Sequence, residues 1–220
     1  MHTTRILKID QVTHDVKRFR IAEPEGFAFS VGDATEIALD EDGWREETRP
    51  FTMTSLPQEK SLEFTIKGYP EHDGVTERLH RMKEGDTVLI ADPFKTFRYE
   101  EPGVFIAGGA GITPFMAIFR HLDRSGKLAG NHLIFANKTS ADIIYRDELD
   151  AMDGLRVDHV LSGEDSAGTH HGEIDADLLK DLVAGFDRRF YLCGPPPMME
   201  ALEEILKSLD VEPDSVDFSD

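Results

Sequence analysis

Residues 103–114 of the chain are GVFIAGGAGITP, and this stretch decides the fold of the second half of the protein. Its first five residues form an apolar run, as expected of a strand that is buried on both faces of a sheet. The glycines that follow allow the backbone to approach a bound group closely, and Pro114 suits the first turn of a helix. The unpaired amides of that turn would attract a pyrophosphate. A tight turn without any ligand is the alternative.

The alternation of strand and helix continues to the end of the chain. After the strand at 103–107 we expect further strands at residues 133–136, 157–161 and 190–193, and helices at residues 114–122, 145–152, 176–183 and 196–209. Such alternation is typical of a parallel sheet with helices on both faces. We therefore predict an α/β doubly wound domain with a parallel five-stranded sheet over residues 101–220.

The first hundred residues have a different pattern, in which short β-rich segments alternate with turn residues. We expect strands at residues 5–12, 16–21, 35–39, 49–54, 62–68 and 87–91, and one helix at residues 75–82. Six strands at this spacing predict an antiparallel six-stranded β-barrel, because closure of a sheet removes its exposed edges. We therefore predict a β-barrel domain over residues 1–100.

Composition excludes several classes of protein. The formal charge of −19 disfavours binding to nucleic acid. No apolar run is long enough for membrane insertion and no secretory signal is present, so we expect a cytoplasmic protein. Cys193 is the only cysteine, and one thiol cannot hold an iron–sulfur cluster. The adjacent His170 and His171 lack a spaced third ligand, so we expect no metal site and interpret them as surface residues on a loop.

A second stretch that could bind a ligand follows the last predicted strand. Its residues are Cys193-Gly194-Pro195-Pro196-Pro197-Met198. Ligands of parallel sheets bind outside the carboxyl ends of the strands, so Cys193 could point into such a crevice. It could equally be a small buried hydrophobic residue.

Two stretches of the first half could bind a cofactor. In Arg49-Pro50-Phe51-Thr52-Met53-Thr54-Ser55, alternate residues share a face, so the arginine and the aromatic ring lie on one side and Thr52 on the other. The guanidinium suits a phosphate and the ring suits a planar group, although an ordinary amphipathic strand would look the same. Asp73-Gly74-Val75-Thr76 begins the predicted helix, where its amides could bind phosphate. Asp73 could instead be a simple N-cap, which is the reading that this stretch alone favours.

Together the four stretches resemble the motifs of the ferredoxin–NADP reductase superfamily, which includes the NADH–cytochrome b reductase-like flavoproteins. RPFTMTS matches its R-x-[YF]-[ST] flavin motif, and DGVT matches its second flavin-phosphate motif. GGAGITP and CGPPPM match its two nicotinamide-dinucleotide motifs. The order and spacing of the four agree over essentially the whole chain.

The resemblance implies which residues bind each cofactor. The flavin would contact Arg49, Pro50, Phe51, Thr52, Thr65, Lys67, Gly74, Val75 and Thr76, with Phe218 of the C-terminal tail as a possible cover for the ring. The dinucleotide would contact Gly109, Gly111, Ile112, Thr113, Pro114, Asp142, Cys193, Gly194, Pro195 and Met198. Thr52 and Cys193 would act as the catalytic residues by polarising and positioning the two rings. One departure from the family pattern is Asp92-Pro93-Phe94-Lys95, where relatives often have G-P-x-G.

The same resemblance implies the cofactors and the reaction. We expect FAD rather than FMN, and NADH rather than NADPH, because Asp142 would repel the extra phosphate and Ser162-Gly163 lacks the arginine of many NADPH users. Lys138 argues for NADPH instead, because its side chain could swing toward the extra phosphate. The expected function is electron transport as an NAD(P)H-dependent oxidoreductase: hydride passes from NADH or NADPH to FAD, and electrons go on to a separate acceptor, namely an iron–sulfur protein such as ferredoxin, a cytochrome, a flavodoxin or a small molecule. A flavin-free NAD-dependent dehydrogenase and a non-catalytic redox regulator are the alternatives.

Overall fold

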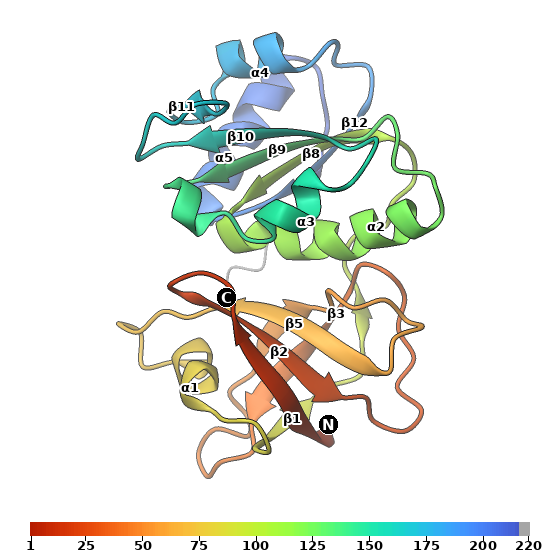
Figure 1. Cartoon of the computed structure of the whole chain (residues 1–220), viewed down its shortest axis with the longest axis vertical. Helices are drawn as coiled ribbons and strands as arrows, with labels where there is room; N and C mark the ends of the chain where they lie inside the picture. Colours follow the sequence, from red (N-terminus) through yellow and green to blue (C-terminus); the bar gives the residue numbers. More distant parts are fainter. Residues whose placement is uncertain (216–220) are drawn as a thin grey trace. The chain divides into compact units, whose positions relative to one another are not determined.

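The computed structural model describes residues 1–215 of the chain, which form two compact units (Figure 1). The first unit comprises Met1–Arg98 together with Met116–His121. The second comprises Tyr99–Phe115 and the described residues from Leu122 onwards. Among the described helices, none has both the length and the hydropathy that crossing a bilayer requires.

The first unit is built on an antiparallel sheet with the strand order β4-β3-β6-β1-β2-β5. These strands are β1 (His2–Gln11), β2 (Val16–Ala22), β3 (Asp33–Leu39), β4 (Arg49–Thr52), β5 (Ser61–Lys67) and β6 (Thr87–Ile90). The amide of Thr54 donates a hydrogen bond to the carbonyl oxygen of Glu63 at 2.8 Å, which links the end of the sheet beyond β4 to β5 and nearly closes it. The predicted six-stranded barrel is confirmed. A two-residue strand, β7 (Phe94–Lys95), also pairs with β3 and was not expected.

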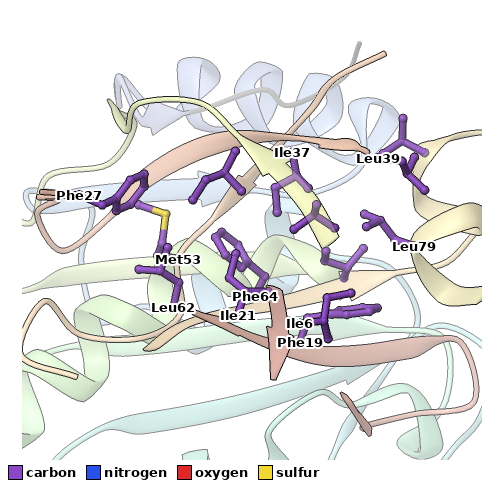
Figure 2. Packing of buried hydrophobic residues seen from close by; sticks show 14 residues of the cluster. Ile6, Phe19, Ile21, Phe27, Ile37, Leu39, Met53, Leu62, Phe64 and Leu79 are labelled. Carbon is purple, nitrogen blue, oxygen red and sulfur yellow. The ribbon is translucent and has the colours of Figure 1, made fainter. Parts of the chain in front are cut away.

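The barrel encloses an apolar core to which most of its strands contribute (Figure 2). On β5 the core side chains are Leu62, Phe64 and Ile66, so the alternation of a strand places Glu63, Thr65 and Lys67 on the other face. The helix α1 (Val75–Arg81) adds Val75 and Leu79, which are one helical turn apart. Each fully buried side chain of this kind contributes about 1.5–3 kcal/mol of transfer free energy. This core leaves polar residues of β5 available on the outer face.

The second unit contains a fully parallel sheet with the strand order β11-β10-β9-β8-β12-β13. Its four long strands are β8 (Gly103–Gly108), β9 (His132–Asn137), β10 (Arg156–Leu161) and β12 (Arg189–Cys193). Two-residue strands, β11 (His170–His171) and β13 (Asp214–Ser215), form its edges and were not expected. From β8 the chain first winds outward through β9 and β10, and then returns to β12 on the other side of β8. This reversal creates a topological switch point between β8 and β12.

Helices cover both faces of this parallel sheet, as the doubly wound prediction requires (Figure 1). Side chains of α4 (Ala176–Leu182) and α5 (Pro196–Ser208) pack with those of the central strands in one apolar cluster. On the opposite face, α3 (Arg146–Asp150) reaches β10, because Asp150 Oδ1 lies 3.5 Å from Nε2 of His159. All six residues of β8 are buried, which explains why that strand is an uninterrupted apolar run.

Candidate functional site

The stretch that follows β8 forms a tight loop that leads directly into a helix. Gly109–Ile112 is a 3₁₀ turn, η1, and α2 (Thr113–Arg124) begins at the next residue. Gly109 has a φ of +51°, a left-handed backbone that glycine adopts at little cost. Thr113 and Pro114 therefore occupy the first turn of a twelve-residue helix, where the missing amide of proline costs no hydrogen bond. This geometry fits an anion bound at the amides of η1 and α2.

The loop after β12 packs directly against the loop after β8. A Cβ on Gly111 would lie 2.2 Å from the carbonyl oxygen of Cys193, and a Cβ on Gly108 would lie 2.5 Å from Sδ of Met198 and 2.8 Å from Cδ of Pro195. Only glycine fits at these two positions. Both of these loops were expected to bind a dinucleotide. The structure brings them together at one edge of the sheet, at the switch point.

Cys193 and the residues after it form a rigid wall at this edge. Cys193 pairs with Ala107 of β8 in the sheet register and is buried, with an exposed fraction of 3%. Pro195 is the N-cap of α5, and Pro196 and Pro197 form its first turn. Prolines here hold the backbone beside Gly194 in one conformation. The roles expected for Cys193, Gly194, Pro195 and Met198 remain predictions that this packing supports.

Asp142 lies in the loop after β9, at the end of the short 3₁₀ turn η2 (Ser140–Asp142). Its Oδ2 accepts hydrogen bonds from the backbone amide and from the hydroxyl of Thr139, both at 2.8 Å, so this oxygen caps the turn. The expected contact with a ribose remains a prediction.

A second carboxylate, which the sequence analysis missed, reaches the same turn. Oε1 of Glu164 accepts a hydrogen bond from the amide of Ser140 at 3.0 Å and another from the hydroxyl of Ser166 at 2.7 Å. The hydrogen bond from Ser166, followed by that from Ser140, lowers the pKa of Glu164, so it is charged at neutral pH. The only sequence signal was its place directly after Ser162-Gly163, beyond the carboxyl end of β10.

In the barrel unit, Thr52 has the environment expected of a cofactor ligand. It is 4% exposed, and its Oγ1 has no hydrogen-bond partner among residues 1–215. Buried hydroxyls are normally paired, so an orphaned one fits a heteroatom of a bound ring. Phe51 packs against the barrel core and is only partly buried, which leaves part of its ring available. Arg49 stands at the start of β4, and its Nη1 donates to the carbonyl oxygen of Thr48 at 2.7 Å. Together these residues fit a flavin.

The outer face of β5 carries the other residues expected near the flavin. Thr65 is buried, and Nζ of Lys67 lies 2.9 Å from Oδ2 of Asp15. Beside them Glu63 accepts hydrogen bonds at Oε1 from Nη1 of Arg120 at 2.7 Å and from the hydroxyl of Thr54 at 2.9 Å. Burial alone would raise the pKa of Glu63, but the charge of Arg120 and these hydrogen bonds outweigh it and lower the pKa. Glu63 is therefore a fixed negative charge on this face.

At the start of α1 the structure corrects one expectation. The N-cap is Gly74 rather than Asp73, and the Asp73 carboxylate instead accepts a hydrogen bond from Nη2 of Arg78 at 3.1 Å. The simple N-cap reading of Asp73 is therefore wrong, because the helix begins one residue later. Val75 is a core residue. The guanidinium of Arg78 stacks over the ring of Trp44, with its carbon 4.0 Å from the ring centroid.

Three further expectations concern residues away from these loops. Phe218 lies outside the described residues. Phe94 of the divergent Asp92–Lys95 loop belongs to β7, with 39% of its surface exposed. His170 and His171 form the edge strand β11 rather than a loop, and Nε2 of His170 lies 3.3 Å from Oδ1 of Asp158. A group of residues suitable for a metal ion is not found within the described part of the chain.

Comparison with known proteins finds two matching family models, both of oxidoreductase domains. Residues 3–99 match the model of the oxidoreductase FAD-binding domain, and residues 105–204 match that of the oxidoreductase NAD-binding domain. The chain is 30% identical over 220 residues to NADH-cytochrome b5 reductase 1 of Ajellomyces capsulatus, covering 90% of this chain and 71% of that protein.

Two further comparisons define the extent of the similarity. The chain is 28% identical to the reductase component of propane 2-monooxygenase from Rhodococcus jostii, where the match covers 97% of this chain but only 61% of the longer relative. The FAD/NAD-binding domain of nitric oxide dioxygenase from Vibrio cholerae has the same fold, with a TM-score of 0.86, 23% identity and 97% coverage of both chains. The chain therefore belongs to the ferredoxin reductase-like superfamily of flavoprotein oxidoreductases, with an FAD-binding barrel and an NAD-binding α/β domain.

Proposed function

We propose that this flavin-dependent NAD(P)H reductase takes hydride from NADH onto FAD and passes the electrons to a separate one-electron acceptor protein. The observation that carries the proposal is the packing of Gly111 against the carbonyl of Cys193. It joins a loop suited to a pyrophosphate and a rigid wall suited to a flat ring at a single switch point. A dinucleotide needs both at once.

The residues of the barrel would hold FAD in a defined orientation. Bound FAD supplies the chemistry that converts a two-electron donor into single electrons. The hydroxyl of Thr52 would pair with a ring heteroatom, and Phe51 would pack against the ring. Arg49 would bind phosphate through its guanidinium, as would the amides near Gly74, Val75 and Thr76. The buried surroundings of Thr52 and Thr65 would exclude water from the ring.

The residues of the α/β domain would hold the dinucleotide. The amides of η1 and of the first turn of α2 would bind its pyrophosphate, and Gly109, Gly111 and Ile112 would shape the loop around it. Cys193 and Gly194 would position the nicotinamide against the wall formed by the prolines. The buried thiol would act by contact and polarisation rather than as a nucleophile.

We propose NADH as the donor because two carboxylates meet at the turn η2. Asp142 caps this turn, and Glu164 binds the amide of Ser140. Two negative charges would repel the 2′-phosphate of NADPH, while carboxylates can accept hydrogen bonds from ribose hydroxyls. The similarity to an NADH-cytochrome b5 reductase supports the same preference.

We propose that the acceptor is a separate protein with an iron–sulfur or haem centre. The chain has one cysteine, which cannot hold a cluster. The similar protein from Rhodococcus jostii is named as the reductase component of a monooxygenase, and the one from Ajellomyces capsulatus as a reductase of cytochrome b5. Both names indicate a protein acceptor for these relatives.

Anaerobic reduction of the FAD-loaded protein tests the proposal directly. NADH should bleach the flavin, with a second-order rate constant about tenfold or more above that for NADPH. Reoxidation should then be faster with a ferredoxin or a b-type cytochrome than with free flavin. Tightly bound flavin that neither nucleotide bleaches would contradict the proposal and favour a regulator. Equal rates with both nucleotides would contradict only the preference for NADH.

A further inference from the structure

Asn137, the last residue of β9, has a buried side chain that the fold does not use. Its exposed fraction is 9%, and neither Nδ2 nor Oδ1 has a hydrogen-bond partner among residues 1–215. Burial of an amide without partners opposes folding, so native proteins rarely keep one without a reason. The sequence motifs did not include this residue.

Asn137 lies beside the loop that is suited to a pyrophosphate. In the sheet register Ala136 pairs with Gly108, so Asn137 leaves the sheet next to Gly109, and β9 lies against η1. Asn137 also pairs with Leu161, the last residue of β10, which leads toward Glu164. The residue therefore stands at the carboxyl edge of the sheet, between the loop after β8 and the loops after β9 and β10. Ligands of doubly wound sheets bind at this edge.

A second asparagine shows what a structural role looks like in the same unit. Asn131 precedes the other end of β9 and is 2% exposed. Its Oδ1 accepts from the amide of Gly103 at 3.2 Å, and its Nδ2 donates to the carbonyl oxygen of Leu128 at 2.9 Å and to the hydroxyl of Tyr99 at 3.3 Å. The fold thus satisfies every polar atom of one buried amide at the amino end of β9. At the carboxyl end of β9, it satisfies neither polar atom of the Asn137 side chain.

The chemistry of the side chain selects the part of the ligand that it binds. Nδ2 needs an acceptor and Oδ1 needs a donor, and both atoms belong to one amide group. At neutral pH a pyrophosphate offers acceptors only, and would leave Oδ1 unpaired. A ribose offers two neighbouring hydroxyls, each of which can donate and accept. The loops after β9 and β10 also carry the carboxylates Asp142 and Glu164, to which the proposed function assigns the ribose hydroxyls.

We propose that Asn137 binds the adenosine ribose of the nicotinamide dinucleotide and that its amide is kept unpaired in the fold for this purpose. The inference rests on the dinucleotide site of the proposed function. Asn137 lies outside the four motifs, and the proposal gives it a share of the affinity for the dinucleotide. Because the same amide opposes folding when no ligand is bound, affinity and stability should respond to its removal in opposite directions.

The test compares N137L with the matched variant N131L in FAD-loaded protein. ADP is the titrant, because it carries the adenosine ribose and the pyrophosphate but neither the nicotinamide nor the second ribose. Calorimetric titration of N137L should give a Kd about tenfold or more above that of the unsubstituted protein. Its ligand-free melting temperature should stay equal or rise. N131L should show the reverse pattern, with an unchanged Kd and a melting temperature lower by about 2 °C or more.

Each outcome decides the proposal. If the unsubstituted protein binds neither ADP nor NADH, the dinucleotide site of the proposed function fails together with the inference. If it binds both and N137L binds ADP equally well, only the role of Asn137 is overturned. A loss of NADH affinity without a loss of ADP affinity would place the contact at the nicotinamide or its own ribose and overturn the assignment to the adenosine ribose. A lower melting temperature of N137L would show that the amide serves the fold. If N137L does not fold, N137A replaces it in the titration.

Discussion

At the scale of single residues, Thr52 and Thr54 form a natural pair for testing the flavin site. The hydroxyl of Thr52 has no partner in the described chain, whereas that of Thr54 donates to Oε1 of Glu63 at 2.9 Å. We expect T52V to slow flavin reduction by NADH about tenfold or more, without lowering the free energy of unfolding. T54V should lower that free energy by about 1–3 kcal/mol, because it leaves a buried carboxylate underpaired. Stopped-flow bleaching and urea titration measure the two effects. A destabilised T52V would contradict this assignment.

Glu164 gives a second prediction at this scale. Replacing it by arginine removes a negative charge beside η2. It also introduces a guanidinium that can bind the 2′-phosphate of NADPH through two hydrogen bonds. E164R should raise the ratio of kcat/KM for NADPH to that for NADH by about tenfold or more. D181K, on the exposed side of α4, changes the net charge by the same amount and should leave the ratio unchanged. Steady-state kinetics with both nucleotides measure this ratio. An unchanged ratio in E164R would show that Glu164 does not face the 2′ position.

Residues with a local signature could be predicted from the sequence, and those defined by tertiary contacts could not. Gly111 and Pro114 belong to a loop whose composition alone indicates a strand-to-helix turn. Glu164 and Asn137 acquire their positions from the parallel pairing of β9 with β10 and β8, which brings segments far apart in the chain together. Whether a side chain has a hydrogen-bond partner also depends on such packing. The orphaned hydroxyl of Thr52 was therefore visible only in the structure.

At the scale of elements, the packing of the loop after β8 against the loop after β12 gives a third prediction. A Cβ at residue 111 would meet backbone atoms of Cys193 and Gly194 at 2.2–2.8 Å, and backbone cannot give way as a flexible side chain can. G111A should therefore lower the free energy of unfolding by about 1–3 kcal/mol and raise the KM for NADH. Gly185 has nothing within 4 Å of its Cβ position, so G185A should change neither quantity. Equal stability of G111A and the unsubstituted protein would show that the two loops are not in contact.

The elements that sequence analysis missed share a physical cause. β7, β11 and β13 contain two residues each, so none has room for the alternation or the apolar run that indicates a strand. Each pairs with backbone groups of a longer strand. β7 pairs with the start of β3, which β6 does not reach, and β11 and β13 pair with the outer edges of β10 and β12. Strands of four residues or more were all anticipated, because their residue patterns are local. Their boundaries differ by a few residues, as expected where ends are defined by pairing partners.

At the scale of the whole molecule, buried titratable groups predict how stability depends on pH. Burial lowers the pKa of three histidines: His80 in the first unit, and His132 and His159 in the second. In the unfolded chain a histidine titrates at its ordinary value of about 6.5. Below that pH the unfolded state binds protons that the folded state resists, so stability falls as the pH drops from about 6.5 toward the folded pKa.

Two carboxylates extend this loss to lower pH. Burial opposes the ionisation of both Asp158 and Glu63. Hydrogen bonds from His132 and His170 nevertheless lower the pKa of Asp158. The charge and the hydrogen bond of Arg120 lower the pKa of Glu63. A lowered carboxylate pKa contributes stability above the unfolded value of about 4, and this contribution is lost as the pH falls through the folded pKa. Acid should therefore destabilise the protein in two successive windows, the first due to histidines and the second due to carboxylates.

The two units should respond differently to the first window, because the second unit holds two of the three histidines. Trp44, the only tryptophan of the chain, reports on the first unit. Of the five α-helices in residues 1–215, three (α3, α4 and α5) lie wholly in the second unit, so circular dichroism reports mainly on that unit. In urea titrations between pH 7.5 and pH 5, the midpoint from circular dichroism should fall further than that from tryptophan fluorescence. H159F removes a buried imidazole whose pKa is lowered by burial and whose Nε2 lies 3.5 Å from Oδ1 of Asp150. This substitution should reduce the pH dependence of the midpoint from circular dichroism and leave that of the midpoint from tryptophan fluorescence unchanged. Midpoints that are constant from pH 7.5 to pH 5 would mean that the histidines are protonated in the folded protein, against the burial seen here.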